Sequence, residues 1–177
     1  MAQDVLEALE LDRVLFVPAA RPPHKDSEGL TPPSLRARMV RAAVVDDSRY
    51  EMADLELRRE GVSYTVDTLE ALKEQYPRAR LHLILGSDQW NAFGEWHKPR
   101  RIADLAHLVV MTRDGTPPAT VDPGFTDGPP PEFAEVQVTR LDLSSTELRE
   151  RIRQGRSIRY LVPEEVRRII EAGKLYS

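Results

Sequence analysis

The stretch "TVDTLEALKEQYPRARLHLILGSDQW" (residues 65–90) decides the fold, because it passes from a helix into a buried strand that stops at a glycine. Apolar residues recur at helical spacing through 65–76 and predict an amphipathic helix. The apolar run 81–86 then predicts a short buried strand. A helix followed directly by such a strand is the repeating unit of an α/β protein.

The same alternation of helices and strands continues on both sides of this stretch. The pattern predicts strands at 13–18, 50–57, 107–113 and 135–143, helices at 5–11, 34–44, 144–154 and 163–173, and short helical pieces over 88–106. Asp4 and Ser34 are the expected N-caps of the first two helices. We therefore predict an α/β, Rossmann-like fold with a mainly parallel sheet and flanking helices. Such folds normally open on a central strand, yet this chain opens on a helix. Either the fold has another strand order, or the first strand is missing from this chain.

Length and composition restrict the class of protein. The 177 residues suit a single domain over 1–177, with an exposed, mobile loop rich in Pro and Gly over 114–134 and a helical C-terminal part over 144–177. There are no cysteines, and the formal net charge of −4 argues against a general nucleic-acid binder. No apolar run approaches the roughly 20 residues of a membrane span, and no signal peptide is visible. We expect a cytoplasmic protein without nucleic-acid or membrane partners.

The stretch "LDLSSTELRERI" (141–152) holds three successive hydroxyl residues where a predicted strand gives way to a helix: Ser144, Ser145 and Thr146. A helix N-terminus favours anions through its free N–H groups and its dipole. Arg149 could add a bidentate contact to a phosphate, and residues 149–177 carry eight Arg and Lys against four Glu. An ordinary N-cap with Glu147 nearby explains the same residues. Spacing alone leaves both interpretations open.

A second candidate site lies where the strand 81–86 ends. Gly86 allows a ligand to approach the backbone, and Asp88 offers a carboxylate to a hydroxyl, an amide or a metal-bound water; Asp88 could instead be the N-cap of the next helix. Trp96 and His97 follow in a short loop. The indole of Trp96 could stack on a flat heterocycle, or it could anchor the loop by packing.

The remaining basic candidates are His24 and Lys25, which lie in a proline-stiffened loop and could contact a phosphate or simply be solvated. His82 and His107 lie in or beside strands, and we interpret them as structural histidines with satisfied hydrogen bonds. The chain has no HExxH, Walker P-loop or GxGxxG motif. Zinc-protease, P-loop and dinucleotide-dehydrogenase functions therefore lack support, and we expect no metal ligands among the site residues.

Four segments together resemble the bacterial nicotinate-nucleotide adenylyltransferases: "PPHK" (22–25), "GVSYTVDTL" (61–69), "LILGSDQWNAFGEWHKPRRI" (83–102) and "LSSTELRERIRQGRSIRYLVPEEVRRII" (143–170). The resemblance runs from about residue 5 to the C-terminus and is weakest in the 114–134 loop. The SSTxxR helix start alone is shared with related nucleotidyltransferases such as pantetheine-phosphate adenylyltransferase. The combination of segments is much more specific.

The resemblance implies a nucleotidyltransferase-type fold and adenylyl transfer from ATP, with Mg²⁺, to nicotinate mononucleotide, giving deamido-NAD and pyrophosphate. It places the ATP phosphates on the hydroxyl residues of the helix start and on Arg149, the one catalytic residue it assigns. It assigns further nucleotide contacts to Gly86 and Asp88. It assigns the contacts to the mononucleotide to a further set of residues, which would bind the ring, the carboxylate and the phosphate: Thr65, Trp96, His97, His24 and Lys25.

The chain departs from this family at its start. The family opens with a strand and a GGTFDPIHxGH-like segment whose histidines bind the ATP phosphates, and the printed sequence contains no such segment. We therefore expect an N-terminally shortened, weakly active form, or a natural variant with little activity. The alternatives are another adenylyltransferase, such as one acting on phosphopantetheine, and a nucleotide-binding remnant without catalysis. A homo-oligomer is compatible with all of these.

Overall fold

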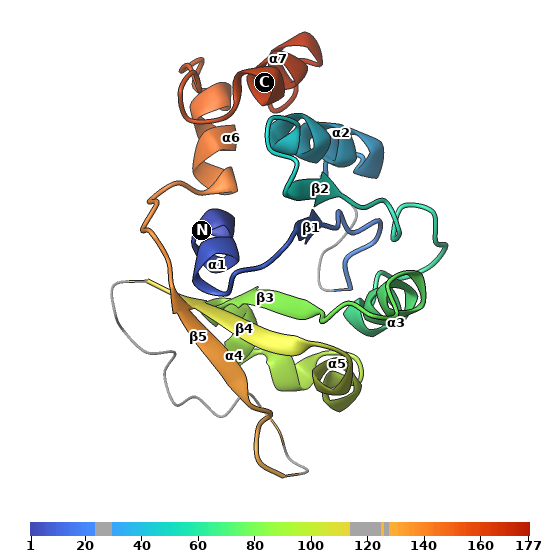
Figure 1. The fold of residues 1–177 in the computed structure, drawn as a ribbon. Coiled ribbons are helices and arrows are strands. Elements are labelled where there is room, and N and C mark those ends of the chain that lie inside the picture. The colour runs from blue at the N-terminus through green and yellow to red at the C-terminus, as the bar shows by residue number, and fades with distance from the viewer. Residues whose placement is uncertain (24–29, 114–124, 126–127) are drawn as a thin grey trace. The chain divides into compact units, whose positions relative to one another are not determined.

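The computed structural model describes residues 1–23, 30–113, 125 and 128–177 (Figure 1). The chain divides into two compact units. Unit 1 comprises Met1–Asp12, Arg21–Lys25 and Arg59–Arg140, and unit 2 comprises Arg13–Ala20, Asp26–Arg58 and Leu141–Ser177. Within the described ranges, none of the helices is both long and apolar enough to span a membrane.

Unit 1 is built on a parallel sheet of three strands in the order β3-β4-β5. The strands are β3 (His82–Gly86), β4 (His107–Thr112) and β5 (Phe133–Gln137). The helices of this unit are α1 (Ala2–Ala8), α3 (Thr65–Gln75), α4 (Ser87–Asn91), the 3-10 turn η1 (Phe93–Glu95) and α5 (Pro99–Leu105). The strands predicted at 81–86 and 107–113 are therefore confirmed.

Both faces of β4 are buried, because successive side chains of a strand point to opposite sides of the sheet. Leu108 and Val110 pack in a core with side chains of α3, α5 and the aromatic residue Phe93. Val109 packs on the other face with Val5 of α1 and with residues of and just after β5. The helices therefore cover both faces of this sheet, with α1 on one side and α3, α4 and α5 on the other (Figure 1).

Unit 2 contains two parallel strands, β1 (Val14–Phe16) and β2 (Tyr50–Met52), and the helices α2 (Pro33–Val44), α6 (Ser145–Arg153) and α7 (Glu164–Ala172). Helix α2 packs against α7 and β2. Two carbonyls outside the helices, those of Ala19 and Thr31, accept hydrogen bonds from Arg36 of α2, at 2.6 Å and 3.0 Å. This arginine therefore fixes two separate loop ends to one helix.

The α/β class with parallel strands is confirmed, but the described strands form two sheets instead of one. The strand expected over 50–57 ends at Met52, because Asp54 starts a turn in which its carbonyl accepts from the N–H groups of Leu57 and Arg58. The strand expected over 135–143 is β5, which begins earlier and ends at Gln137. Beyond it the backbone N–H of Thr139 donates to the carboxylate of Asp4 at 3.1 Å.

Both N-cap predictions for the first helices are wrong. Helix α1 starts at Ala2, which leaves Asp4 inside the first turn, where its carboxylate binds Thr139 instead. Helix α2 starts at Pro33 with Pro32 as the N-cap, because a proline in the first turn has no N–H to leave unpaired. Most of the loop expected over 114–134 lies outside the described residues. Phe125 within it is buried beneath the guanidinium of Arg100, 4.3 Å from the ring centroid.

Helix α6 begins with a complete capping box. The side-chain oxygen of Ser144 accepts a hydrogen bond from the backbone N–H of Glu147 at 3.1 Å, and the Glu147 carboxylate accepts from the N–H of Ser144 at 3.4 Å. The predicted helix start at 144 is confirmed. The backbone N–H groups of Ser144 and Glu147 each donate to the side chain of the other residue. The box therefore fixes the conformation of the exposed first turn.

We expect Ser144→Ala to lower the free energy of unfolding by about 1 kcal/mol, since it removes the cap of an exposed helix. Ser145→Ala is the matched control, because its exposed hydroxyl makes no hydrogen bond within the described residues. Urea denaturation followed by circular dichroism would measure both. Equal midpoints for the two variants would contradict the capping argument.

Candidate functional site

The carboxyl end of β3 brings a carboxylate close to a glycine backbone. Gly86 is the N-cap of α4 and has ordinary dihedral angles, φ −75° and ψ 158°. A Cβ atom placed at Gly86 would meet Oδ1 of Asp88 at 2.6 Å, so the present position of this carboxylate depends on the absence of a side chain at Gly86 and not on an unusual backbone conformation. The alternative of Asp88 as an N-cap is wrong, because Gly86 takes that position. Asp88 lies exposed in the first turn of α4.

The loop after η1 places an aromatic pair beside the core of unit 1. Trp96 is partly buried and packs on Phe93, with ring centroids 5.5 Å apart. This contact is the packing role that the sequence left open, while the exposed part of the indole stays available for stacking. Lys98 follows in the left-handed region at φ 55°, just before Pro99. A bulky residue is rarely held there unless its surroundings enforce it.

Tyr64 connects two of the predicted site residues. Its ring lies against the ring of His97, with centroids 4.3 Å apart, and Tyr64 is the N-cap residue from which Thr65 begins α3. The neighbouring Ser63 exchanges hydrogen bonds with the backbone of Arg21, at 2.9 Å and 3.2 Å. Thr65 and His97 are therefore brought together through a residue that the sequence analysis missed. The only signal for Tyr64 was its place in the "SYT" segment.

In unit 2, the start of α6 presents backbone donors to solvent. Glu147 donates to Ser144, and Leu148 donates to the Ser144 carbonyl, but the N–H groups of Ser145 and Thr146 have no hydrogen-bond acceptor within the described ranges. Both residues are exposed. The cap and the anion site are therefore compatible, because the cap uses one donor of the first turn and leaves two others free for a ligand.

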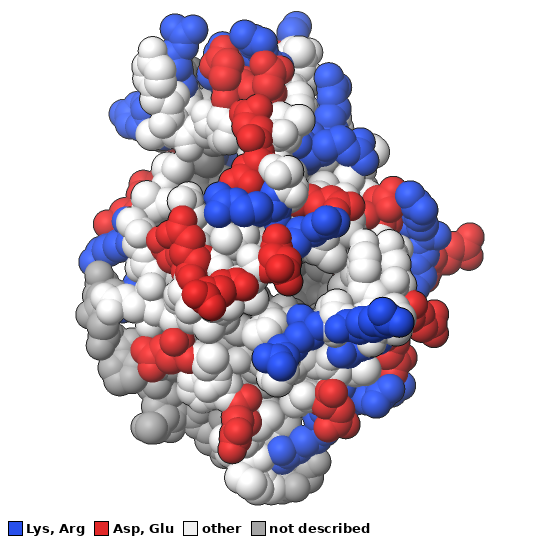
Figure 2. Space-filling view, viewed as in Figure 1, with Lys and Arg blue, Asp and Glu red and all other residues white. Residues whose placement is uncertain are grey.

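The basic character of residues 149–177 is less available than the sequence suggests. Figure 2 shows acidic and basic side chains interspersed over the viewed face. On α7, Arg167 contacts Glu164 and Glu171, and the hydrogen bond from Arg167 lowers the pKa of Glu164 to about 2. Arg149 of α6 differs, because it has no carboxylate partner among the described residues. Its guanidinium lies over the ring of Tyr176 instead.

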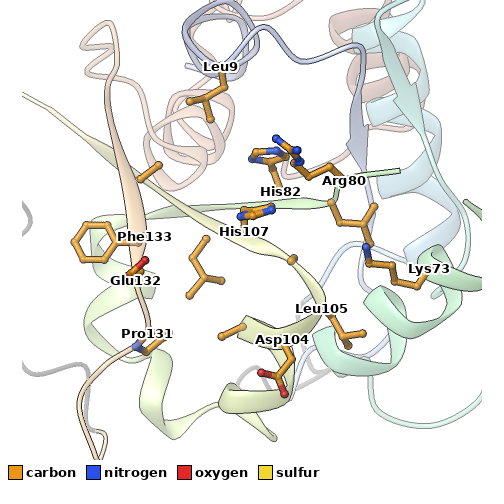
Figure 3. A pocket seen from close by; sticks show the side chains of 15 residues that line it. Leu9, Lys73, Arg80, His82, Asp104, Leu105, His107, Pro131, Glu132 and Phe133 are labelled. Atoms are coloured by element: carbon orange, nitrogen blue, oxygen red, sulfur yellow. The ribbon is translucent and has the colours of Figure 1, made fainter. Parts of the chain in front are cut away.

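A cavity of about 540 Å³ lies at the amino ends of the strands of unit 1 (Figure 3). His82 and His107 are paired across β3 and β4, with ring centroids 5.1 Å apart, and both line it. The prediction of satisfied histidines is wrong for His82, since its buried Nδ1 has no hydrogen-bond partner in the described chain. Burial, followed by His107 and Arg80, holds the pKa of His82 below its usual value. The predicted site residues do not line this cavity.

Two of the expected contacts, His24 and Lys25, lie outside the described residues. Across the part of the chain that is described, no group of three or more His, Asp or Glu side chains could hold a metal ion. The described candidates therefore form two separate sets. One is Thr65, Gly86, Asp88, Trp96 and His97 in unit 1, and the other is Ser144, Ser145, Thr146 and Arg149 in unit 2.

Comparison with known proteins relates the chain to one family. The model of the cytidylyltransferase-like family matches residues 1–151. A protein of Gemmatimonas aurantiaca named "Probable nicotinate-nucleotide adenylyltransferase" is 42% identical over 99% of this chain and 83% of its own length. A protein of the same name from Desulfitobacterium hafniense is 40% identical over 94% of this chain and 82% of its own.

A solved structure shares the fold. The nicotinic acid mononucleotide adenylyltransferase of Plasmodium falciparum, complexed with NaAD, superposes with a TM-score of 0.71 at 18% identity, over 99% of this chain and 89% of that one. The structural likeness supports the α/β nucleotidyltransferase fold, and the sequence identities establish the relationship. The chain belongs to the nicotinate-nucleotide adenylyltransferases of the cytidylyltransferase-like family.

Proposed function

We propose that this protein transfers the adenylyl group of ATP to nicotinate mononucleotide, giving deamido-NAD and pyrophosphate in NAD biosynthesis. The observation that carries the proposal is the start of α6, where two N–H groups without an acceptor and an arginine without a carboxylate partner, as far as the described residues go, occur on one short helix. These are the donors that a polyphosphate requires. The names of the relatives agree with this reaction.

The reaction needs positioning and charge stabilisation more than covalent chemistry by the protein. The phosphate oxygen of the mononucleotide attacks the α-phosphorus of ATP in line, the bond from this phosphorus to the bridging oxygen breaks, and pyrophosphate leaves. The donors of Ser145, Thr146 and Arg149 hold the ATP phosphates and stabilise the charge that accumulates on the leaving group. Ser144 keeps the turn in shape through its cap and adds a hydroxyl group.

The set in unit 1 suits the mononucleotide and the nucleoside part of ATP. The exposed part of Trp96 offers a flat surface to the pyridine ring, and His97 is held beside it by Tyr64. Thr65 lies at the first position of α3, where a carboxylate is favoured by the helix N-terminus. Gly86 and Asp88 offer an open backbone and a carboxylate to the nucleotide. His24 and Lys25 remain proposed phosphate contacts.

Mg²⁺ fits this donor set as an ion that arrives with ATP. It usually keeps several waters and is held by substrate phosphates with one or two carboxylates. The described residues provide no multidentate cluster but do provide the exposed carboxylate of Asp88. The ion would neutralise charge on the phosphates. We further propose a cytoplasmic location, which the absence of cysteine favours.

The reaction is tested by incubating the protein with ATP, Mg²⁺ and one acceptor at a time: nicotinate mononucleotide, nicotinamide mononucleotide or phosphopantetheine. We expect pyrophosphate release to be fastest with nicotinate mononucleotide, and mass spectrometry to identify deamido-NAD. Faster turnover with phosphopantetheine would favour the other adenylyltransferase. ATP binding in calorimetry without turnover on any acceptor would favour a nucleotide-binding protein without catalysis.

Arg149→Lys should lower kcat/KM for ATP by about 10- to 100-fold, because a lysine keeps the charge but loses the bidentate contact to phosphate. Arg168→Gln is the matched control: it removes a positive charge from α7, where the arginine contacts only exposed Glu164 and Glu165. Steady-state kinetics with varied ATP would measure both variants. Similar losses in the two would show that the effect is not specific to the guanidinium at position 149, because Arg149→Lys keeps the charge that Arg168→Gln removes.

Gly86→Ala should change function more than stability. The new Cβ displaces the carboxylate of Asp88, a flexible exposed side chain, so we expect the unfolding midpoint to stay nearly unchanged. If Asp88 contacts the nucleotide, kcat/KM for ATP should fall about ten-fold, as for the loss of one charged hydrogen bond. Asp88→Asn provides the comparison. An alanine variant with full activity beside an impaired Asn variant would refute the steric argument.

A further inference from the structure

Tyr176, which follows α7, contacts the arginine on which the proposed function depends. We propose that Tyr176 is a positioning residue that holds the guanidinium of Arg149 ready for the phosphates of ATP. This inference rests on the proposed function, because it assigns a role to Tyr176 only through Arg149. Both residues belong to unit 2, as do all their partners described below.

The contact between them fixes the arginine without neutralising it. The Cζ atom of Arg149 lies 5.4 Å from the centroid of the Tyr176 ring, and both side chains are partly buried. A ring attracts a cation through its quadrupole but carries no net charge. A carboxylate in the same place would orient Arg149 equally well and would compete with the phosphate. A tyrosine therefore gives orientation while the charge stays available to the ligand.

The ring itself is held at its far end. The hydroxyl of Tyr176 makes a 2.6 Å hydrogen bond with the hydroxyl of Thr31, and the carbonyl of Thr31 accepts from Nε of Arg36 at 3.0 Å. Arg36 also donates to the carbonyl of Ala19. A chain of contacts thus runs from α2 through Thr31 and the tyrosine ring to Arg149. The tyrosine is tied to two different parts of the unit.

The backbone leading to this ring includes two residues with positive φ. Tyr176 has φ 69° and Lys174 has φ 45°, so two bulky residues adopt the left-handed conformation within three positions. Such a conformation is costly for residues other than glycine and persists only when surrounding contacts enforce it. Lys174 adopts it at the end of α7, where the N–H of Leu175 donates to the carbonyl of Ile170. Tyr176 is held by its contacts with Thr31 and Arg149.

Another arginine–tyrosine pair in unit 2 shows what a purely structural contact involves. The guanidinium of Arg49 lies 5.9 Å from the ring centroid of Tyr50, but it also binds Asp47, whose pKa it lowers to about 2. The charge of Arg49 is therefore already compensated. The ring of Tyr50 packs on Phe16, 6.1 Å away. Tyr50 supplies a matched control, since its loss should affect packing and not ATP.

The first measurement is the dissociation constant for ATP by calorimetry, which needs no turnover, together with kcat and both KM values. We expect Tyr176→Leu to weaken ATP binding about three- to five-fold, the size of a partly exposed cation–π contact, with KM for the mononucleotide unchanged. Tyr176→Phe keeps the ring and should lose less, and Thr31→Val should match it. Tyr50→Leu should lower the melting temperature without changing ATP affinity.

A double-mutant cycle decides whether Tyr176 acts through the arginine. In an Arg149→Gln background, Tyr176→Leu should cause no further loss of ATP affinity, because the guanidinium that it positions is gone. Additive losses, or a Tyr176→Phe variant as weak as Tyr176→Leu, would overturn the positioning role while leaving the proposed function standing. An Arg149→Gln protein with unchanged ATP affinity would overturn the phosphate role of Arg149 itself.

Discussion

Both faces of β4 are covered, and this burial sets the place of the other elements in unit 1. Leu108 and Val110 face one layer of helices, and Val109 faces α1. A strand buried on both sides cannot slip by one residue without exchanging its two faces, so its register with β3 and β5 is strongly specified. Because the three strands are parallel, all their carboxyl ends lie at one edge. Gly86, the last residue of β3, and Asp88, just after it, lie at that edge.

Unit 2 depends more on polar contacts and on how its charges are distributed. On α7, Arg167 and Arg168 form ion pairs with glutamates of the same helix. On α2, Arg36 donates hydrogen bonds to loop carbonyls. Arg149 instead lies over the uncharged ring of Tyr176, as Arg159 lies over that of Tyr160. Exposed ion pairs add little stability, so the glutamates of α7 serve mainly to compensate its arginines. Among the described residues, the guanidinium of Arg149 on α6 has no carboxylate partner.

The sequence predicts what depends on local periodicity and misses what depends on distant partners. The buried strands at 81–86 and 107–113 are continuous apolar runs, and such runs are recognised directly. The end of β5 depends on the hydrogen bonds between Thr139 and Asp4, which are 135 residues apart. The same is true of the site. The helix start at Ser144 was visible as a local pattern, whereas the contacts of Tyr64 with His97 and of Tyr176 with Arg149 join segments that no spacing rule connects.

Backbone strain occurs beside two of the groups that we propose to bind, although Glu10, Tyr160 and Lys174 have positive φ without such a role. Every residue of the five strands avoids positive φ, while Lys98 and Tyr176 adopt it. Lys98 ends the turn that carries Trp96 and His97, and Tyr176 supports Arg149. The left-handed residue at 98 directly follows the side chain of His97, and the one at 176 carries the ring on which Arg149 lies. Strain of this kind opposes folding and persists only where surrounding contacts enforce it, and at Lys98 and Tyr176 it lies next to the proposed pyridine and phosphate contacts.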